Sequence, residues 1–201
     1  MASETDLLND GLSQIGAATI TAIDDGSANA NYCQRLYPPL RDSLLRAHHW
    51  NFNTTRVELA LDVIAPVSGY AYAYTLPADC LKVVDYGGTL PVSAGVITLD
   101  QRYGVVAHYK IEGRKLLSND GQAFITYLRR ETNPDVWDGM FYQAVASLLA
   151  SKLASAITKD TKKALSLYQV GNDLLLMAMA VDGQEGSIEP LISDELLWGR
   201  S

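Results

Sequence analysis

The chain has 201 residues, which suffices for one compact domain with an insertion but not for two large lobes. Hydrophobic residues make up 48% of it and charged residues 19%, a balance that is typical of a globular protein and excludes a disordered or fibrous chain. The longest unbroken apolar run, residues 174–181, is much shorter than the roughly 20 residues of a membrane-spanning helix. The sequence therefore predicts a folded protein with no membrane partner.

The net charge of −7 is concentrated at the two ends of the sequence. Residues 1–30 contain five acids and no base, and residues 182–201 contain five acids and one base. A protein that grips nucleic acid through phosphates usually shows a clear excess of Lys and Arg. Tight DNA binding is therefore not expected. The alternative, a connector that binds DNA directly, would use a basic patch of Arg129, Arg130, Lys159, Lys162 and Lys163.

Two helices are predicted before the first strand. Ser3 and the acids after it are typical of a helix start, and leucines at helical spacing carry this helix to Gly16. A second helix is expected over residues 28–48, after a turn at residues 23–27 that supplies its cap. Two adjacent prolines inside it, at positions 38 and 39, are expected to kink or split this helix.

Alternation of apolar and polar residues predicts a small, mainly antiparallel sheet in the middle of the chain. Strands are expected at residues 54–61, 70–74, 81–86, 96–99, 105–111 and 123–130. Turn signals separate them, among them the adjacent glycines Gly87 and Gly88.

Two further helices follow the sheet. Asn133 and Pro134 predict a helix start, and the pattern continues to about residue 157. Another helix is expected to run from residue 158 or 160 to residue 181. The predicted fold class is α+β, a mainly α-helical bundle with a small antiparallel β-rich insertion between the second and third long helices. The predicted domains are residues 1–53 and 131–183 as one discontinuous helical bundle, residues 54–130 as the β-rich insertion, and residues 184–201 as a C-terminal arm.

Small side chains recur every four residues on the third long helix, where they would allow another helix to approach closely. Ala146, Ala150 and Ala154 form one stripe, and Ser147, Ser151 and Ser155 form another. The partner helix could belong to the same chain or to a second subunit, because periodicity does not say which chain supplies it. Of these positions, the candidate subunit interface comprises Ala146, Ala150, Ala154, Ser147 and Ser151.

The end of the fourth helix, residues 174–181, is apolar around its whole circumference and must be covered on all sides. Burial by a second subunit is favoured there, with Leu176 and Met179 as candidate contacts. The acidic C-terminal segment ends in an apolar tip, and its Leu197 and Trp198 are further candidates for docking on a partner.

The sequence carries no recognisable catalytic motif. His48 and His49 are adjacent and would project about 100° apart on a helix, which does not suit a shared metal. HExxH, GxSxG, GxxxxGK[ST] and GxGxxG are all missing. Cys33 and Cys80 lack metal-ligand spacing and are expected to be free buried thiols. We therefore expect no enzyme, no cofactor and no metal.

Several short segments, in this order and spacing, resemble the tail tubular protein A family, the adaptor ring of short-tailed bacteriophages. They are LSQIGA at 12–17, ITAIDDGS at 20–27, RDSLLR at 41–46, His48 with WNF at 50–52, YTLPADCL at 74–81, YKIEGR at 109–114 with Leu116 and Leu117, NPD at 133–135, and Trp137, Asp138, Phe141, Ala144 and Leu148. His49 stands where the family usually has proline, and Asn53 where alanine is common.

The resemblance implies a structural virion protein in the tail, at the portal vertex of the capsid. It implies a homo-oligomeric ring of twelve subunits between the portal protein and the tail nozzle protein, assembled in the host cytoplasm. DNA would pass through the lumen without specific binding. Twelve copies at −7 would carry about −84 in total, which agrees with such a role because an acidic channel repels a sliding polyanion.

The alternative function is a tail-associated glycan or peptidoglycan hydrolase, because some phage tail components degrade the cell envelope. The sequence offers it only scattered acids, such as Glu112 and Asp135.

Overall fold

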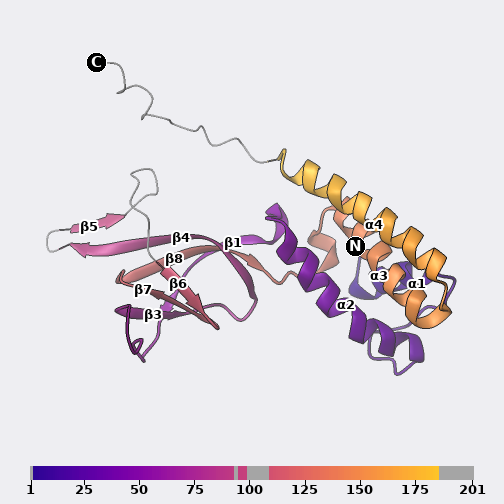
Figure 1. Ribbon diagram of the computed structural model, residues 1–201, viewed down its shortest axis with the longest axis horizontal. Coiled ribbons are helices and arrows are strands. Elements are labelled where there is room, and N and C mark those ends of the chain that lie inside the picture. The colour runs from indigo at the N-terminus through magenta and orange to yellow at the C-terminus, as the bar shows by residue number, and fades with distance from the viewer. Residues whose placement is uncertain (1, 93–94, 99–108, 186–201) are drawn as a thin grey trace, which may run out of the picture.

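The computed structural model describes residues 2–92, 95–98 and 109–185 (Figure 1). Within these ranges the chain folds into four α-helices and two antiparallel sheets. The α-helices are α1 (Glu4–Gln14), α2 (Ala28–Ala47), α3 (Gly139–Leu153) and α4 (Thr161–Asp182). Short helical turns are η1 (Asn51–Asn53), η3 (Pro134–Val136) and η4 (Ala154–Thr158). Figure 1 shows the helices gathered at one end of the molecule and the strands at the other.

The predicted fold class, a mainly helical bundle with a small β-rich insertion, is wrong. The protein is mixed α/β, and only about half of the described residues are helical. The strands are β1 (Thr54–Glu58), β2 (Ala60–Leu61), β3 (Tyr72–Thr75), β4 (Cys80–Val92), β5 (Gly95–Thr98), β6 (Tyr109–Glu112), β7 (Lys115–Ser118) and β8 (Gln122–Arg129). They form two four-stranded sheets with a core of their own, so the β part is a second folding layer and not a minor insertion.

The first sheet has the strand order β1-β8-β4-β5, and the second has the order β2-β3-β7-β6. Gly87 and Gly88 do not form the predicted turn, because β4 continues through them and pairs them with Phe124 and Ala123 of β8. A strand without side chains at two positions lacks the alternation by which strands are recognised, which explains why the length of β4 was underestimated.

A buried polar cluster joins the two sheets. The Asp120 carboxylate accepts hydrogen bonds from Tyr86 Oη (2.5 Å) and Ser118 Oγ (2.9 Å), and the Asp120 carbonyl accepts one from Tyr74 Oη (2.5 Å). Burial raises the pKa of the Tyr86 hydroxyl above its usual range, so this group stays a proton donor. Because these buried polar groups have hydrogen-bond partners, the cluster holds one sheet against the other.

In the helical part, α3 is the central helix and packs against α1, α2 and α4. Asp138 begins α3 by accepting hydrogen bonds from the backbone N–H groups of Met140 (2.8 Å) and Phe141 (3.1 Å). The prolines at 38 and 39 do not split α2, which is continuous from Ala28 to Ala47.

An aromatic cluster covers the start of α3. Trp50 is fully buried, and its ring centroid lies 4.6 Å from that of Phe141 and 5.7 Å from that of Phe52. Its indole N–H donates to the Leu44 carbonyl (3.1 Å). Trp137 completes the cluster from the other side of Phe141. The WNF segment therefore anchors the end of α2 and the first strand onto α3.

Candidate assembly surfaces

Five of the six small residues in the stripes, which run from α3 into η4, are buried within the chain, whereas Ser155 of η4 is exposed. Ala146, Ala150, Ala154, Ser147 and Ser151 are all at most 8% exposed. Ser151 Oγ donates to the Ala164 carbonyl of α4 (2.8 Å), and a Cβ added at Gly171 of α4 would lie 2.6 Å from Leu148 Cγ. These side chains thus allow α4 of the same chain to pack closely, and their role in a subunit interface stays a prediction.

Two of these residues also line an open groove of about 530 Å³ between α1 and α4. Ala146 and Ser147 of α3 contribute to its lining, with Asp10, Ser13 and Gln14 of α1 and Leu174 of α4 on the sides. Tyr142 Oη donates to the Asp10 carboxylate (2.7 Å), which joins α1 to α3 beside the groove. Of the predicted interface residues, Ala146 and Ser147 thus lie at the floor of this groove, although both side chains are almost fully buried.

Helix α4 is apolar but only partly covered. Leu175 and Ala178 are buried against the rest of the chain, whereas Leu176 is 64% exposed and Met177 57% exposed. Met179, also a predicted contact, is half-buried and packs against the helical core. Leu197 and Trp198, the last two predicted contacts, lie outside the described residues.

Exposed apolar residues continue toward the start of α4, where no contact was predicted. They are Leu165, Tyr168 and Val170. The sequence signal was present, because these residues are apolar, but polar residues between them hid the pattern when only the unbroken run 174–181 was considered.

By length and composition, two helices of the described chain could cross a membrane: Gly139–Thr158 and Thr161–Asp182, each with a mean hydropathy of 1.3. Buried core helices pass the same test, and the first segment, which contains α3, is largely buried. The expectation of no membrane partner, which was based on unbroken apolar runs, stays a prediction.

A second exposed apolar feature lies in the β part, on the loop between β2 and β3. Val63 and Val67 are fully exposed there, and Ile64 is 71% exposed. Asp62, which precedes them, forms an ion pair with Lys115 of β7 (2.6 Å) that ties the loop to the second sheet. The loop thus presents a small apolar surface from an anchored base.

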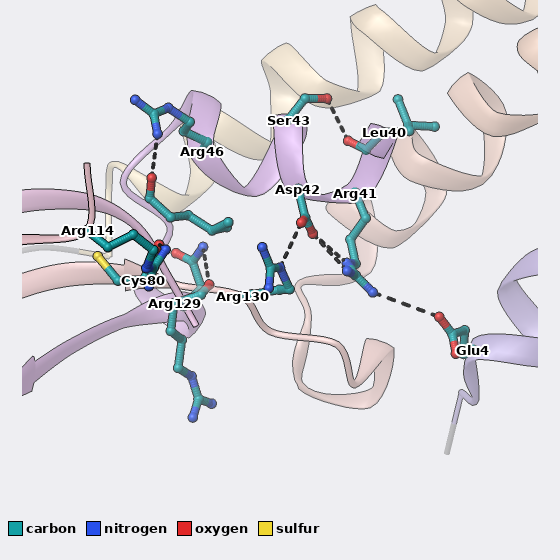
Figure 2. Close-up of polar contacts among 12 residues, drawn as sticks. Glu4, Leu40, Arg41, Asp42, Ser43, Arg46, Cys80, Arg114, Arg129 and Arg130 are labelled. Atoms are coloured by element: carbon teal, nitrogen blue, oxygen red, sulfur yellow. Dashed lines mark hydrogen bonds and ion pairs between the residues drawn. The ribbon is translucent and has the colours of Figure 1, made fainter. Parts of the chain in front are cut away.

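A network of ion pairs and hydrogen bonds between side chains lies where α2 meets the segment that follows β8 (Figure 2). Asp42 accepts hydrogen bonds from Arg41 (2.8 Å) and from Arg130, which follows β8 (2.7 Å). Arg41 also lies 3.9 Å from Glu4 of α1. Arg46 of α2 donates to the Leu81 carbonyl of β4 (2.5 Å), as Figure 2 shows. These bonds fix the sheets relative to the helices.

The end of α4 is joined to the same region. The Asp182 carboxylate is 3.0 Å from His48 Nε2 and accepts a hydrogen bond from the Asn51 N–H (3.0 Å). The Asn51 side chain donates to the Asp182 carbonyl (3.0 Å), which satisfies a backbone acceptor at the helix end. The end of α4 is therefore held by the connection between α2 and β1.

Within the described ranges, no group of three or more His, Cys, Asp or Glu side chains could hold a metal ion. Both cysteines are free and buried. His49 lies against Lys82 (3.3 Å), and burial together with the charge of Lys82 lowers the pKa of His49. His108 lies outside the described residues.

The residues considered for a hydrolase and those considered for direct DNA binding do not come together in the structure. Glu112 of β6 forms an ion pair with Lys110 (2.7 Å), and Asp135 belongs to η3 in the helical part. In the candidate basic patch, Arg129 pairs with Glu131, while Lys159 and Lys162 lie at the turn into α4. The five basic residues are thus divided between the end of the sheet and the far end of α3.

No family model matches the sequence, and a search of curated proteins found no match.

Proposed function

We propose that this chain is a structural subunit of the head-to-tail adaptor ring of a short-tailed bacteriophage. It joins the portal to the tail nozzle as one of twelve copies and lines part of the DNA passage. The proposal rests first on the ordered segments that resemble the tail tubular protein A family. Several of them have a structural role here, since the WNF segment and Phe141 form the aromatic cluster that holds α2 on α3.

Helix α4 is the structural observation that carries the proposal. It is 22 residues long and apolar, yet only 17% of its most apolar 18-residue window is buried. Exposed apolar area of this extent on a protein surface is typical of a site that is covered in an assembly. A structural subunit needs such a surface, whereas an enzyme needs convergent polar groups in a pocket.

The loop with Val63, Ile64 and Val67 supports a second contact, at the other end of the molecule. We assign it to the nozzle protein, because the β part lies away from the helices that we assign to the ring (Figure 1). A small apolar loop of this kind would fit into a depression on a partner.

Incubation with purified portal rings of the same phage, followed by density-gradient sedimentation and imaging, tests the proposal. We expect the chain to travel with the portal and to add a ring of density to one of its faces. Portal rings that stay bare at native salt would contradict the proposal. The chain alone remaining monomeric would not, since the portal supplies the template in this scheme.

A turbidity assay on cell-wall material separates the adaptor from the alternative hydrolase. We expect no clearing by the full chain at any concentration that decorates the portal. Clearing that is lost in the Glu112→Gln or Asp135→Asn variant would show that the main function is that of an enzyme and not that of an adaptor.

A further inference from the structure

Four of the chain's seven lysines lie within one segment of twelve residues, at the turn between α3 and α4. They are Lys152, Lys159, Lys162 and Lys163, and Asp160 is the only acid among them. Four bases and one acid give this segment a charge of +3, in a chain whose net charge is −7. We call the four lysines the basic tip.

The fold gathers these lysines at the end of the hairpin that α3 and α4 form. Ser151 Oγ of α3 donates to the Ala164 carbonyl of α4 (2.8 Å). Lys152 and Lys163 adjoin these two residues in the sequence, so they lie at the same level of the hairpin. The seven residue steps from Lys152 to Lys159 cover about 10 Å at 1.5 Å per residue. Figure 1 shows this turn at the end of the molecule that is remote from the sheets.

The side chains of the basic tip are free. Within the described ranges, none of the four ammonium groups forms an ion pair or a hydrogen bond, and only Lys163 is half-buried. Each of the other lysines contacts a neighbouring side chain: Lys82 lies 3.3 Å from His49, Lys110 2.7 Å from Glu112, and Lys115 2.6 Å from Asp62. The uncompensated lysine charge of the described chain is therefore concentrated at one place.

Two lysines of the basic tip lie where the helix dipole disfavours a positive charge. Lys162 and Lys163 belong to the first turn of α4, which begins at Thr161 and contains no acidic residue. The backbone N–H groups give this end of a helix a partial positive charge, so Asp or Glu stabilises it and lysine destabilises it. Asp160 caps the helix by accepting a hydrogen bond from the Lys163 N–H (3.0 Å), but its single charge faces two lysines.

The backbone of Lys159 is also unusual. Lys159 is the only described residue other than glycine with a positive φ, 54°, and it ends η4 in the left-handed conformation. Glycine adopts this conformation freely, whereas the Cβ of other residues comes too close to the following carbonyl oxygen. Three of the four lysines thus occupy positions at which another residue would stabilise the fold. Such exceptions to local preference are expected where a side chain serves binding.

We infer that the basic tip binds the phosphate backbone of DNA. Free ammonium groups beside the N-terminus of a helix attract anions, and lysines contact phosphates as point charges without reading the bases. Protein interfaces are depleted in lysine, so a phosphate backbone suits the tip better than a protein surface does. The inference goes beyond the proposed function, which places DNA in the passage but assigns no residue that contacts it.

The charges predict a weak contact that is sensitive to salt. A duplex has one phosphate charge per about 1.7 Å of its axis, so a tip of about 10 Å lies opposite about six of them, enough for four lysines. Four contacts give a slope of about −3 to −4 in a plot of log affinity against log salt, so each doubling of salt weakens binding about tenfold. The charge of −7 on the whole chain opposes binding, which favours brief contacts with a moving duplex.

Fluorescence anisotropy of the full chain with short labelled duplexes of two unrelated sequences tests the inference. We expect equal affinity for the two sequences. Lys162→Gln with Lys163→Gln is expected to lower the affinity about tenfold or more at low salt and to reduce the slope by about two. Arg35→Gln with Arg56→Gln is the matched control, because it removes two charges from exposed side chains that form no ion pair with the described chain, and only a small loss is expected there.

Lys159→Gly separates a role in binding from a role in folding. Glycine relieves the left-handed conformation, so the melting temperature is expected to stay unchanged or to rise, while the affinity for the duplex falls several-fold. A lower melting temperature with unchanged affinity would show that Lys159 serves the fold and not a ligand.

Three further results would overturn the inference. They are no binding of either duplex at the lowest salt; an equal loss in the arginine control, which indicates an effect of net charge alone; and equal competition by polyglutamate, which indicates an acidic protein as the partner. Failure of the proposed function looks different: the duplex would bind as expected while portal rings stayed bare. Decorated portal rings built from a chain that binds no duplex would refute the inference alone.

Discussion

Helices α3 and α4 have the same mean hydropathy, 1.3, but very different surroundings. The segment that contains α3 is 56% buried over its most apolar window, and α4 only 17%. Helix α3 is apolar because α1, α2 and α4 surround it. Helix α4 buries Leu175 and Ala178 against the rest of the chain but leaves six large apolar side chains exposed: Leu165, Tyr168, Val170, Leu176, Met177 and Val181. Two helices of equal hydropathy therefore differ in what they do: α3 stabilises the fold from its centre, whereas α4 leaves an apolar surface exposed.

Truncation of one leucine in each helix tests this difference most strongly. Leu149→Ala on α3 removes a fully buried side chain and is expected to lower the free energy of unfolding by about 2–5 kcal/mol. Leu176→Ala on α4 is expected to change it by less than about 0.5 kcal/mol, because the side chain is already exposed. Urea unfolding of the full chain measures both. Equal losses would show that α4 is not the exposed helix described above.

The contact between the two helices is tested at Gly171. A Cβ there would lie 2.6 Å from Leu148 Cγ and 3.1 Å from the Leu148 backbone nitrogen, so Gly171→Ala forces the helices apart. We expect a loss of about 1–3 kcal/mol in the free energy of unfolding. Gly139→Ala is the matched control, because no atom lies within 4 Å of the added group, and a small gain is expected there. A gain at both positions would disprove the close packing.

The attachment at the end of α4 gives a smaller effect. Asp182→Ala removes the acceptor of the Asn51 N–H, which water can partly replace because Asn51 is exposed, and is expected to cost about 0.5–1.5 kcal/mol. Asp182→Asn keeps an acceptor oxygen and is expected to cost less. Amide hydrogen exchange in the last turn of α4 reports the change directly. Unaltered protection in Asp182→Ala would mean that this bond does not hold the helix end.

The smallest effect is expected at the turn before α2. Hydrogen bonds from Ser27 and Thr21 hold the pKa of Asp25 at about 2, below its ordinary value of 3.8. Because the folded value is the lower one, the carboxylate stabilises the fold above about pH 4, and this contribution is lost as the pH falls through about 2. Asp25→Asn is expected to flatten the pH dependence of the melting temperature in that range. A parallel shift at all pH values would contradict this assignment.

Local signals in the sequence predicted much of the helical part. Ser3 and Ser27 do cap α1 and α2, and Asp160 caps α4, because such caps are decided by neighbouring residues. The fold class was wrong because the size of the β part depends on pairing between distant strands. β7, which pairs with the distant β3, was missed, and β4 was judged too short because Gly87 and Gly88 interrupt its alternation of apolar and polar residues.

The candidate assembly surface, like the sheets, could be predicted only in part from the sequence. Periodicity identified the small residues of α3 but not the chain that covers them, and the structure places α4 of the same chain there. The exposed apolar residues of α4 could not be separated from its buried residues by sequence alone, because both sets are apolar. Only the position of α3 shows which of them remain exposed.

The mass of the complex between this chain and purified portal rings tests the central claim most directly. Native mass measurement is expected to give a portal ring with twelve added copies. Leu176→Asp, which places a charge on the exposed side of α4, is expected to abolish that complex without lowering the melting temperature. A portal ring that binds no copies, or a scattered number that never closes at twelve, would contradict the account.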